Sequence, residues 1–232
     1  MNKIAGLLLA AGASSRMGQP KQLLPLGKRS LLEHAIRQAL GSRIDLLFLV
    51  LGSHAKEIRE RLAPELLVSR LRIVENARYK EGISTSIIAG IRQIQSSYDH
   101  TLILLGDMPW ISSNLINHLI EEYLRSGLSL GAVKTRRGRS LPVIVGRKFY
   151  PQLHELRGDI GARELFHKFP REVCLVEQDG TYEDSDIDTP AEYEAARRLW
   201  EVTSSGKKES STSAETPFSP SPRDRSKSTI KF

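Results

Sequence analysis

The sequence has a single cysteine, Cys174, among 232 residues, which excludes an internal disulfide. Its apolar surroundings, VCLV, predict a buried and inert thiol, and so low a cysteine content is typical of a reducing compartment such as the cytoplasm. No apolar run approaches the ~20 residues that span a bilayer, so a membrane partner is not expected. The apolar run after Met1 is short and leads into a patterned loop, which predicts a first strand rather than a signal peptide.

The sequence also lacks a strong excess of charge. Its formal net charge is +7, and the last thirty residues, from Thr203, hold six basic against three acidic side chains. This modest and scattered excess suits an anionic small molecule such as a nucleotide. It is too weak to predict binding to nucleic acid.

Apolar segments of strand length alternate with segments of helical periodicity. The predicted strands are Ile4–Leu9, Leu46–Leu51, Leu71–Val74, Thr101–Leu105, Leu130–Val133, Pro142–Val145 and Val173–Val176. The predicted helices are Leu31–Leu40, Ala55–Leu62, Ser84–Ile94, Ser113–Arg125, Ala162–His167 and Ala191–Val202. The alternation predicts an α/β fold of three layers, with a mostly parallel, Rossmann-like sheet between helices.

The composition changes near residue 203. Residues 203–232 are rich in Ser, Thr, Pro and charge and contain few apolar side chains. A segment of this kind cannot bury enough apolar surface to order itself. We therefore expect one folded domain over residues 1–202 and a disordered tail over residues 203–232.

Two loops follow predicted strands at the end of the sheet where ligands of α/β proteins bind. The first begins after Leu9 and offers a row of backbone N–H groups from Ala10 to Ser15, followed by Arg16 and Lys21. Small side chains would let phosphates approach such amides closely. The loop fits neither the Walker pattern nor the G-x-G-x-x-G fingerprint, and an ordinary glycine turn beside two surface cations is the alternative. The second loop contains Asp107 in Gly-Asp-Met-Pro, which also suits a simple turn.

The stretch LAAGASSRMGQPKQLLPLG resembles the nucleotide-binding signature of the MobA-like nucleotidyltransferases. It is most similar to the molybdenum cofactor cytidylyltransferases, whose loop reads Leu-Ala-Ala-Gly, whereas the guanylyltransferases typically have Leu-Ala-Gly-Gly. The resemblance continues through ENARYKEGISTSIIAGI, LLGDMPWIS, LPVIVGRKFYPQLHELRGDIGAREL and DIDTPAEYE, and it covers roughly residues 3–200. It implies the nucleotidyltransferase type of α/β fold.

The resemblance also implies roles for individual residues. Leu9, Ala10, Ala11 and Gly12 would lie along the base and ribose, Arg16 and Lys21 would contact the triphosphate, and Gly82 and Ser86 would hold the base. Asp107 and Asp188 would bind Mg²⁺, which prefers carboxylates together with substrate phosphates. Asp186 is the competitor for the second position, and an N-cap for the last helix is the alternative role of Asp188.

The implied reaction is transfer of CMP from CTP to molybdopterin with release of pyrophosphate, in the service of a client molybdoenzyme. An ionised phosphate is already a nucleophile, so positioning and charge stabilisation by Mg²⁺, Lys21 and Arg16 would suffice. The six histidines are scattered, which predicts structural or surface roles for them. The alternatives are another phosphorylated acceptor, a non-catalytic partner that delivers a cofactor, and an oxidoreductase.

The acceptor half of the pattern departs from the family. Relatives often carry His or Asn where this chain has Leu141, although the motif RGDIGAREL is intact. The resemblance assigns Pro142, Asp159 and Arg163 to the acceptor side. A charged loop nearby would either meet an anionic acceptor or, as the favoured interpretation, simply face solvent; its residues are Arg136, Arg137 and Arg139.

Overall fold

Seven strands form one sheet in the computed structural model, which describes residues 2–62, 69–136, 138–178 and 185–209. The strand order is β5-β4-β1-β6-β8-β7-β9. The bounds are β1 Ile4–Ala10, β4 Leu46–Leu51, β5 Leu71–Glu75, β6 His100–Leu105, β7 Leu130–Thr135, β8 Gly138–Gly146 and β9 Val173–Val176. Only β8 runs antiparallel to its neighbours in this sheet, so the prediction of a mostly parallel sheet is confirmed.

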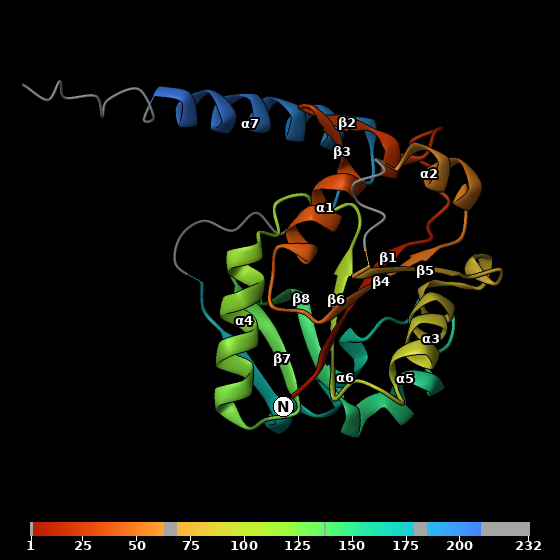
Figure 1. Cartoon of the computed structure of the whole chain (residues 1–232), viewed down its shortest axis with the longest axis vertical. Coiled ribbons are helices and arrows are strands. Elements are labelled where there is room, and N and C mark those ends of the chain that lie inside the picture. The colour runs from red at the N-terminus through yellow and green to blue at the C-terminus, as the bar shows by residue number, and fades with distance from the viewer. Residues whose placement is uncertain (1, 63–68, 137, 179–184, 210–232) are drawn as a thin grey trace, which may run out of the picture.

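Helices cover both faces of the sheet (Figure 1). Their bounds are α1 Leu31–Leu40, α2 Ala55–Arg61, α3 Ile83–Ile94, α4 Ser113–Ser126, α5 Tyr150–Glu155, α6 Arg163–Lys168 and α7 Pro190–Glu209. Two short strands, β2 Pro25–Leu26 and β3 Arg29–Ser30, form a separate hairpin before α1. Ser30 and Glu33 make a reciprocal capping box at the start of α1.

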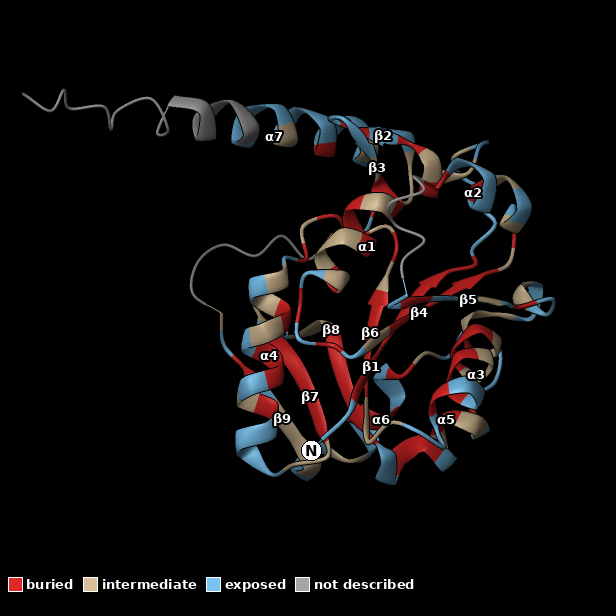
Figure 2. Cartoon of the chain, in the orientation of Figure 1, coloured by how far each residue is buried: buried red, intermediate tan, exposed pale blue. Residues whose placement is uncertain are grey.

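The strand β1 shows how the core is divided between the two faces. Its seven residues are all buried. Leu8 packs with the side chains of α1 and α4, whereas Leu7 and Leu9 pack with those of α3, α5 and α6. Successive side chains of a strand point to opposite faces, so a continuous apolar run requires a cover on both sides. The three-layer architecture follows, with the buried strands lying between the helices in Figure 2.

Some local features differ from the sequence-based predictions. The helix α5 was not among the predicted helices; its Pro151 lies in the first turn, where a proline is tolerated. Cys174 is half-buried on the edge strand β9 rather than buried, and its Sγ lies 3.8 Å from the carbonyl oxygen of Glu122.

The last helix, α7, runs past the predicted boundary at residue 202 and ends at Glu209. Residues 210–232 lie outside the described part of the chain, so the disorder of the tail stays a prediction. The described helices include none that is both long enough and apolar enough to cross a membrane.

The first turns of α7 are attached to the body by a third, smaller apolar cluster that includes Leu26, Leu31 and Ile187. Trp200 completes this cluster. Its ring lies 4.4 Å from the ring of His34 and 5.7 Å from that of Trp110, measured between centroids. The hairpin and the helix therefore stabilise each other across the outer side of α1 (Figure 1).

We expect the change Trp200→Ala to lower the free energy of unfolding by about 2 kcal/mol, because it removes a large side chain from a partly buried cluster. Urea denaturation followed by circular dichroism measures the change. Val202 is 71% exposed on the same helix and provides the control. Val202→Ala should shift the unfolding midpoint very little, and an equal loss in the two variants would contradict a docked Trp200.

Candidate active site

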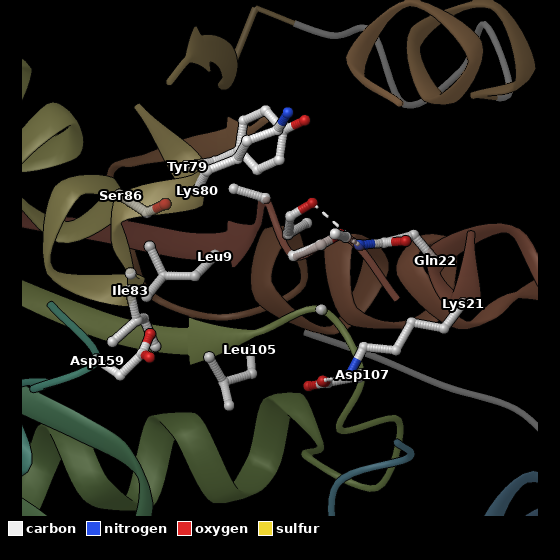
Figure 3. A pocket seen from close by; sticks show the side chains of 16 residues that line it. Leu9, Lys21, Gln22, Tyr79, Lys80, Ile83, Ser86, Leu105, Asp107 and Asp159 are labelled. Carbon is white, nitrogen blue, oxygen red and sulfur yellow. Dashed lines mark hydrogen bonds and ion pairs between the residues drawn. The ribbon is translucent and has the colours of Figure 1, made fainter. Parts of the chain in front are cut away.

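A cavity of about 490 Å³ opens at the carboxyl ends of β1 and β6. It is lined by residues 9–13, by Lys21 and Gln22, by residues 79, 80, 82, 83 and 86, by residues 105–107, and by Asp159. Lys21 and Asp107 point toward each other at one end, while Ile83 and Asp159 lie at the other end (Figure 3). The cavity thus lies where parallel α/β sheets bind their ligands, and its size suits a nucleotide.

The loop after β1 presents unpaired amides to this cavity. The backbone N–H groups of residues 12–15 donate no hydrogen bond within the described part of the chain. A Cβ placed on Gly12 would meet no atom within 4 Å, so the main chain is open to a ligand at this point. Of the predicted row of amides from Ala10 to Ser15, those of residues 12–15 are therefore available to bind an anion, whereas Ala10 belongs to β1.

Gln22 holds the conformation of this loop through side-chain hydrogen bonds, a role that was not predicted from the sequence. Its side chain is 2% exposed and donates hydrogen bonds to the carbonyl oxygens of Ala10 (3.2 Å) and Gly12 (3.1 Å). It accepts one from Ser14 (3.3 Å), whose φ of +53° lies in the left-handed region. Ser14 in turn accepts a hydrogen bond from the backbone N–H of Lys21 at 3.1 Å. The one sequence feature that could have indicated this role is a polar residue placed directly before the apolar run LLPL.

Lys21 lies between two carboxylates. Its ammonium group is paired with Asp107 and also donates to Asp188 at 2.5 Å. Arg16 lies further out, 67% exposed, and pairs with the other oxygen of Asp188 at 2.7 Å. The structure thus brings together the four charged residues that the sequence predicts for the site. Arg16 itself does not line the cavity.

The alternative role of Asp188 as a helix N-cap is wrong. Thr189 is the residue that precedes α7, and its hydroxyl accepts a hydrogen bond from the backbone N–H of Glu192 at 3.3 Å. The Glu192 carboxylate accepts hydrogen bonds from the backbone N–H groups of Asp188 and Thr189. The cap leaves the Asp188 side chain available to the site, whereas Asp186 is exposed and has no bond to Lys21.

The pKa values reflect this ion cluster. Burial raises the pKa of the Asp107 carboxyl above its usual value, and the adjoining Lys21 offsets this only in part. Burial lowers the pKa of Lys21, but the two carboxylates outweigh it and hold the ammonium charged. Burial raises the pKa of the Asp188 carboxyl, but Lys21 and Arg16 outweigh burial and hold this pKa below its usual value. A positive charge between the two carboxylates therefore favours their ionised forms.

The donor set fits a hard divalent cation. Asp107 Oδ1 is buried and has no hydrogen-bond partner among the described residues, so it offers lone pairs inside the cavity. The described residues contain no group of three His, Cys, Asp or Glu side chains arranged for a metal. A cation held by Asp107 and Asp188 would therefore complete its shell with water and substrate phosphates, as Mg²⁺ commonly does.

The start of α3 forms the opposite wall. Ser86 is 4% exposed and accepts a hydrogen bond from the Asn76 side chain at 2.9 Å, which fixes its hydroxyl beside the cavity. Gly82 has a φ of +103°, and a Cβ on it would lie 2.2 Å from the carbonyl carbon of Gly158. Only glycine allows this approach, which brings the loop carrying Asp159 against α3.

A second, mainly apolar pocket of about 260 Å³ adjoins the first and shares Leu9, Ile83, Leu105 and Asp159 with it. Leu141, Val143 and Phe166 line its apolar part, and Arg163 lines its rim. Asp159 thus lines both pockets and Arg163 lines the second; their part in binding an acceptor stays a prediction. Pro142 is buried within β8 and lines neither pocket, and Arg137 lies outside the described residues.

The histidines take no part in the cavity. His34 is buried and hydrogen-bonds to the carbonyl oxygen of Leu26 at 2.7 Å, and His100 hydrogen-bonds to Tyr123 at 3.0 Å. None of the six lines the cavity that contains Lys21 and Asp107. The charged chemistry of the site thus rests on lysine, arginine and aspartate.

Comparison with known proteins adds to this geometry. The chain is 31% identical over 213 residues to the purine catabolism protein PucB of Bacillus subtilis, a match that covers 84% of this chain and 96% of that protein. It is 30% identical over 197 residues to nicotine blue oxidoreductase of Paenarthrobacter nicotinovorans, covering 80% and 92%. It is 35% identical over 121 residues to the molybdenum cofactor cytidylyltransferase of Escherichia coli, covering 51% of this chain and 59% of that protein.

Solved structures have the same fold. The crystal structure of an Rv0371c homologue from Mycobacterium sp. strain JC1 superposes with a TM-score of 0.75 at 29% identity, covering 86% of this chain and 98% of that one. Rv0371c of Mycobacterium tuberculosis in complex with manganese gives a TM-score of 0.70 at 24% identity, covering 85% and 98%. The family model described as the MobA-like NTP transferase domain matches residues 6–173, so the chain belongs to the family of MobA-like NTP transferases.

Proposed function

We propose that this chain transfers CMP from CTP to molybdopterin and releases pyrophosphate in a reaction that depends on a divalent cation, Mg²⁺ in the cell. The observation that carries the proposal is the position of Lys21 between Asp107 and Asp188, beside a loop of unpaired amides. These groups form one binding region for a triphosphate and its counterion. No protein nucleophile is required, because the acceptor phosphate is itself the nucleophile.

On binding, Lys21 and Arg16 would exchange their carboxylate partners for the phosphates of the substrate, and the carboxylates would exchange these side chains for the cation. The amides of residues 12–15, Arg16 and Lys21 bind the triphosphate, while Asp107 and Asp188 hold the cation. A cation held by these two carboxylates would stabilise negative charge on the phosphates. An oxygen of the acceptor phosphate forms a bond to the α-phosphorus, and the bond from the α-phosphorus to the bridging oxygen breaks as pyrophosphate leaves. Lys21 and Arg16 stabilise the charge that develops on the departing group.

The choice of cytosine is supported by Ala11, which is 6% exposed and lines the cavity. Its methyl group narrows the cavity relative to a glycine at this position, which favours a pyrimidine over the larger guanine. The Leu-Ala-Ala-Gly loop and the similarity to a cytidylyltransferase support the same choice.

The position of the apolar pocket beside the cavity supports molybdopterin as the acceptor. The apolar pocket adjoins the end of the cavity where Leu105 and Asp159 lie, so a planar acceptor would fit there with its phosphate directed at the nucleotide. Leu141 makes this pocket more apolar than the polar residue common in relatives would. A different phosphorylated acceptor is therefore the second candidate.

A panel of nucleotides tests the proposal. We expect pyrophosphate release with molybdopterin and CTP in the presence of Mg²⁺ or Mn²⁺, much less with GTP, and none after chelation of the metal. Release with GTP but not CTP would overturn the base assignment, and release with other phosphorylated acceptors alone would establish the second candidate. Absence of release with every pair, together with a flavin spectrum in the purified protein, would favour an oxidoreductase.

A further inference from the structure

The third apolar cluster joins the chain segments that carry the four charged residues of the site. Each of these residues lies no more than three positions along the chain from a member of the cluster. The four pairs are Arg16 with Met17, Lys21 with Leu24, Asp107 with Trp110, and Asp188 with Ile187. The packing of apolar side chains therefore restricts, through the main chain, where these charges meet.

Asp188 has the closest connection to this cluster. Its neighbour Ile187 is 2% exposed, whereas the Asp188 side chain itself is 26% exposed. The backbone N–H of Ile187 donates a hydrogen bond to the carbonyl oxygen of Asp107 at 3.2 Å. Ile187 thus anchors its segment twice, by a buried side chain and by a bond to the residue that carries the other carboxylate.

The helix α7 continues this anchorage. The hydroxyl of Tyr193 donates a hydrogen bond to the carbonyl oxygen of Pro25, in β2, at 2.6 Å. Trp200 packs against Trp110, which lies in the loop after β6. The helix therefore contacts the hairpin and the loop that follows β6. Because α7 begins two residues after Asp188, its docked position also determines where the Asp188 carboxylate lies.

We propose that Ile187 and Trp200 are positioning residues for the divalent cation, and that they act through Asp188 by holding its carboxylate opposite Asp107. Residues behind the ligands of a metal orient those ligands, and their loss commonly weakens metal binding about tenfold or more. An apolar side chain does this when it keeps the segment that carries the ligand from moving. The inference rests on the proposed cation position at Asp107 and Asp188, and it is independent of the base and of the acceptor.

The affinity of the full chain for Mn²⁺ alone tests this inference, with the free ion measured by electron paramagnetic resonance. We expect Ile187→Ala to raise the dissociation constant of Mn²⁺ about tenfold. Trp200→Ala should raise it less, because this ring lies further from Asp188 along α7. Ile187→Val retains most of the buried side chain and should bind Mn²⁺ nearly as the wild type does. Tripolyphosphate in a metal-free buffer should bind Ile187→Ala no more weakly than the wild type, because Arg16, Lys21 and the loop amides remain.

Leu153→Ala is the control for a general loss of stability. Leu153 is fully buried on α5, in the cluster on the other face of the sheet, and it lines neither pocket. This variant should melt at a temperature at least as low as that of Ile187→Ala and should bind Mn²⁺ as the wild type does. An equal loss of Mn²⁺ affinity in Leu153→Ala and Ile187→Ala would overturn the inference. Wild-type affinity in either Ile187→Ala or Trp200→Ala would overturn it as well.

Asp188→Asn separates this inference from the proposed function. It should weaken Mn²⁺ binding at least as much as Ile187→Ala does, because the ligand itself loses its charge. Weakened binding in Asp188→Asn together with wild-type binding in Ile187→Ala would refute the inference alone. Wild-type binding in both variants would refute the proposed cation position as well. Failure of pyrophosphate release with every substrate, together with the expected Mn²⁺ affinities, would refute the proposed reaction and support the positioning role.

Discussion

The variant Lys21→Met is expected to transfer nucleotide 10²- to 10³-fold more slowly, a loss typical of removing one group that stabilises developing charge. It is also expected to bind Mn²⁺ more tightly than the wild type when no nucleotide is present. The ammonium of Lys21 now lies between Asp107 and Asp188, so a cation must displace it to reach the carboxylates. Methionine has a similar length and no charge, and it leaves those oxygens free. Electron paramagnetic resonance of Mn²⁺ measures the second effect without any reaction.

Lys80 provides the matched control for this experiment. It lines the same cavity, and its ammonium lies over the ring of Tyr79 at 6.0 Å from the centroid, without a carboxylate partner in the described structure. Lys80→Met therefore removes an equal charge and should leave the affinity for Mn²⁺ alone nearly unchanged. Identical Mn²⁺ affinities in the wild type and the Lys21→Met variant would show that Lys21 does not compete for the metal position.

The variant Gly82→Ala is expected to lose 3 kcal/mol or more of folding free energy, or about half of what a marginally stable domain has. Two effects add. The φ of +103° is unfavourable for any residue with a Cβ, and that atom would lie 2.2 Å from the main chain of Gly158. Because main-chain atoms cannot rotate away, the loop that carries Asp159 must move. Affinity for the nucleotide should fall as well, since Ile83 and Ser86 follow Gly82 directly along the cavity wall.

Gly127 separates the two effects. It ends α4 with a φ of +67°, and a Cβ there would meet no atom within 4 Å. Gly127→Ala should therefore cost about 1 kcal/mol, the price of the left-handed conformation alone. Guanidinium denaturation of both variants gives the comparison. Equal losses at the two positions would mean that the close approach of Gly82 to Gly158 contributes nothing.

Most helices and strands could be predicted from the sequence, because the patterns that indicate them involve residues close together in the chain. The helix Leu31–Leu40 and the strand Leu46–Leu51 have the predicted bounds, since a capping box marks the first and a continuous apolar run marks the second. The helix Tyr150–Glu155 was not predicted; it has only six residues, and its Pro151 lies in the first turn, where a proline is tolerated. The last helix was predicted to end too early, at Val202, because the polar sequence beyond it has no apolar face.

Only part of the candidate site could be predicted from the sequence. Arg16, Lys21 and Asp107 stand in loops that follow strands, so their types and positions predict a common location. The role of Asp188 was ambiguous, because a cap and a ligand have the same local sequence; the cap made by Thr189 resolved it. The hydrogen bonds of Gln22 and the lining of the apolar pocket depend on contacts between residues distant in the chain, which periodicity does not reveal.

The sequence by itself therefore determined the α/β fold, the loop of small residues and the cations beside it, because each depends on residues close together in the chain. The tertiary structure alone decided that Asp107 and Asp188, 81 positions apart, share Lys21 and that Gly82 closes on Gly158. The physical reason is that pairing of charges, close approach of main chains and burial are properties of surfaces that meet only after folding.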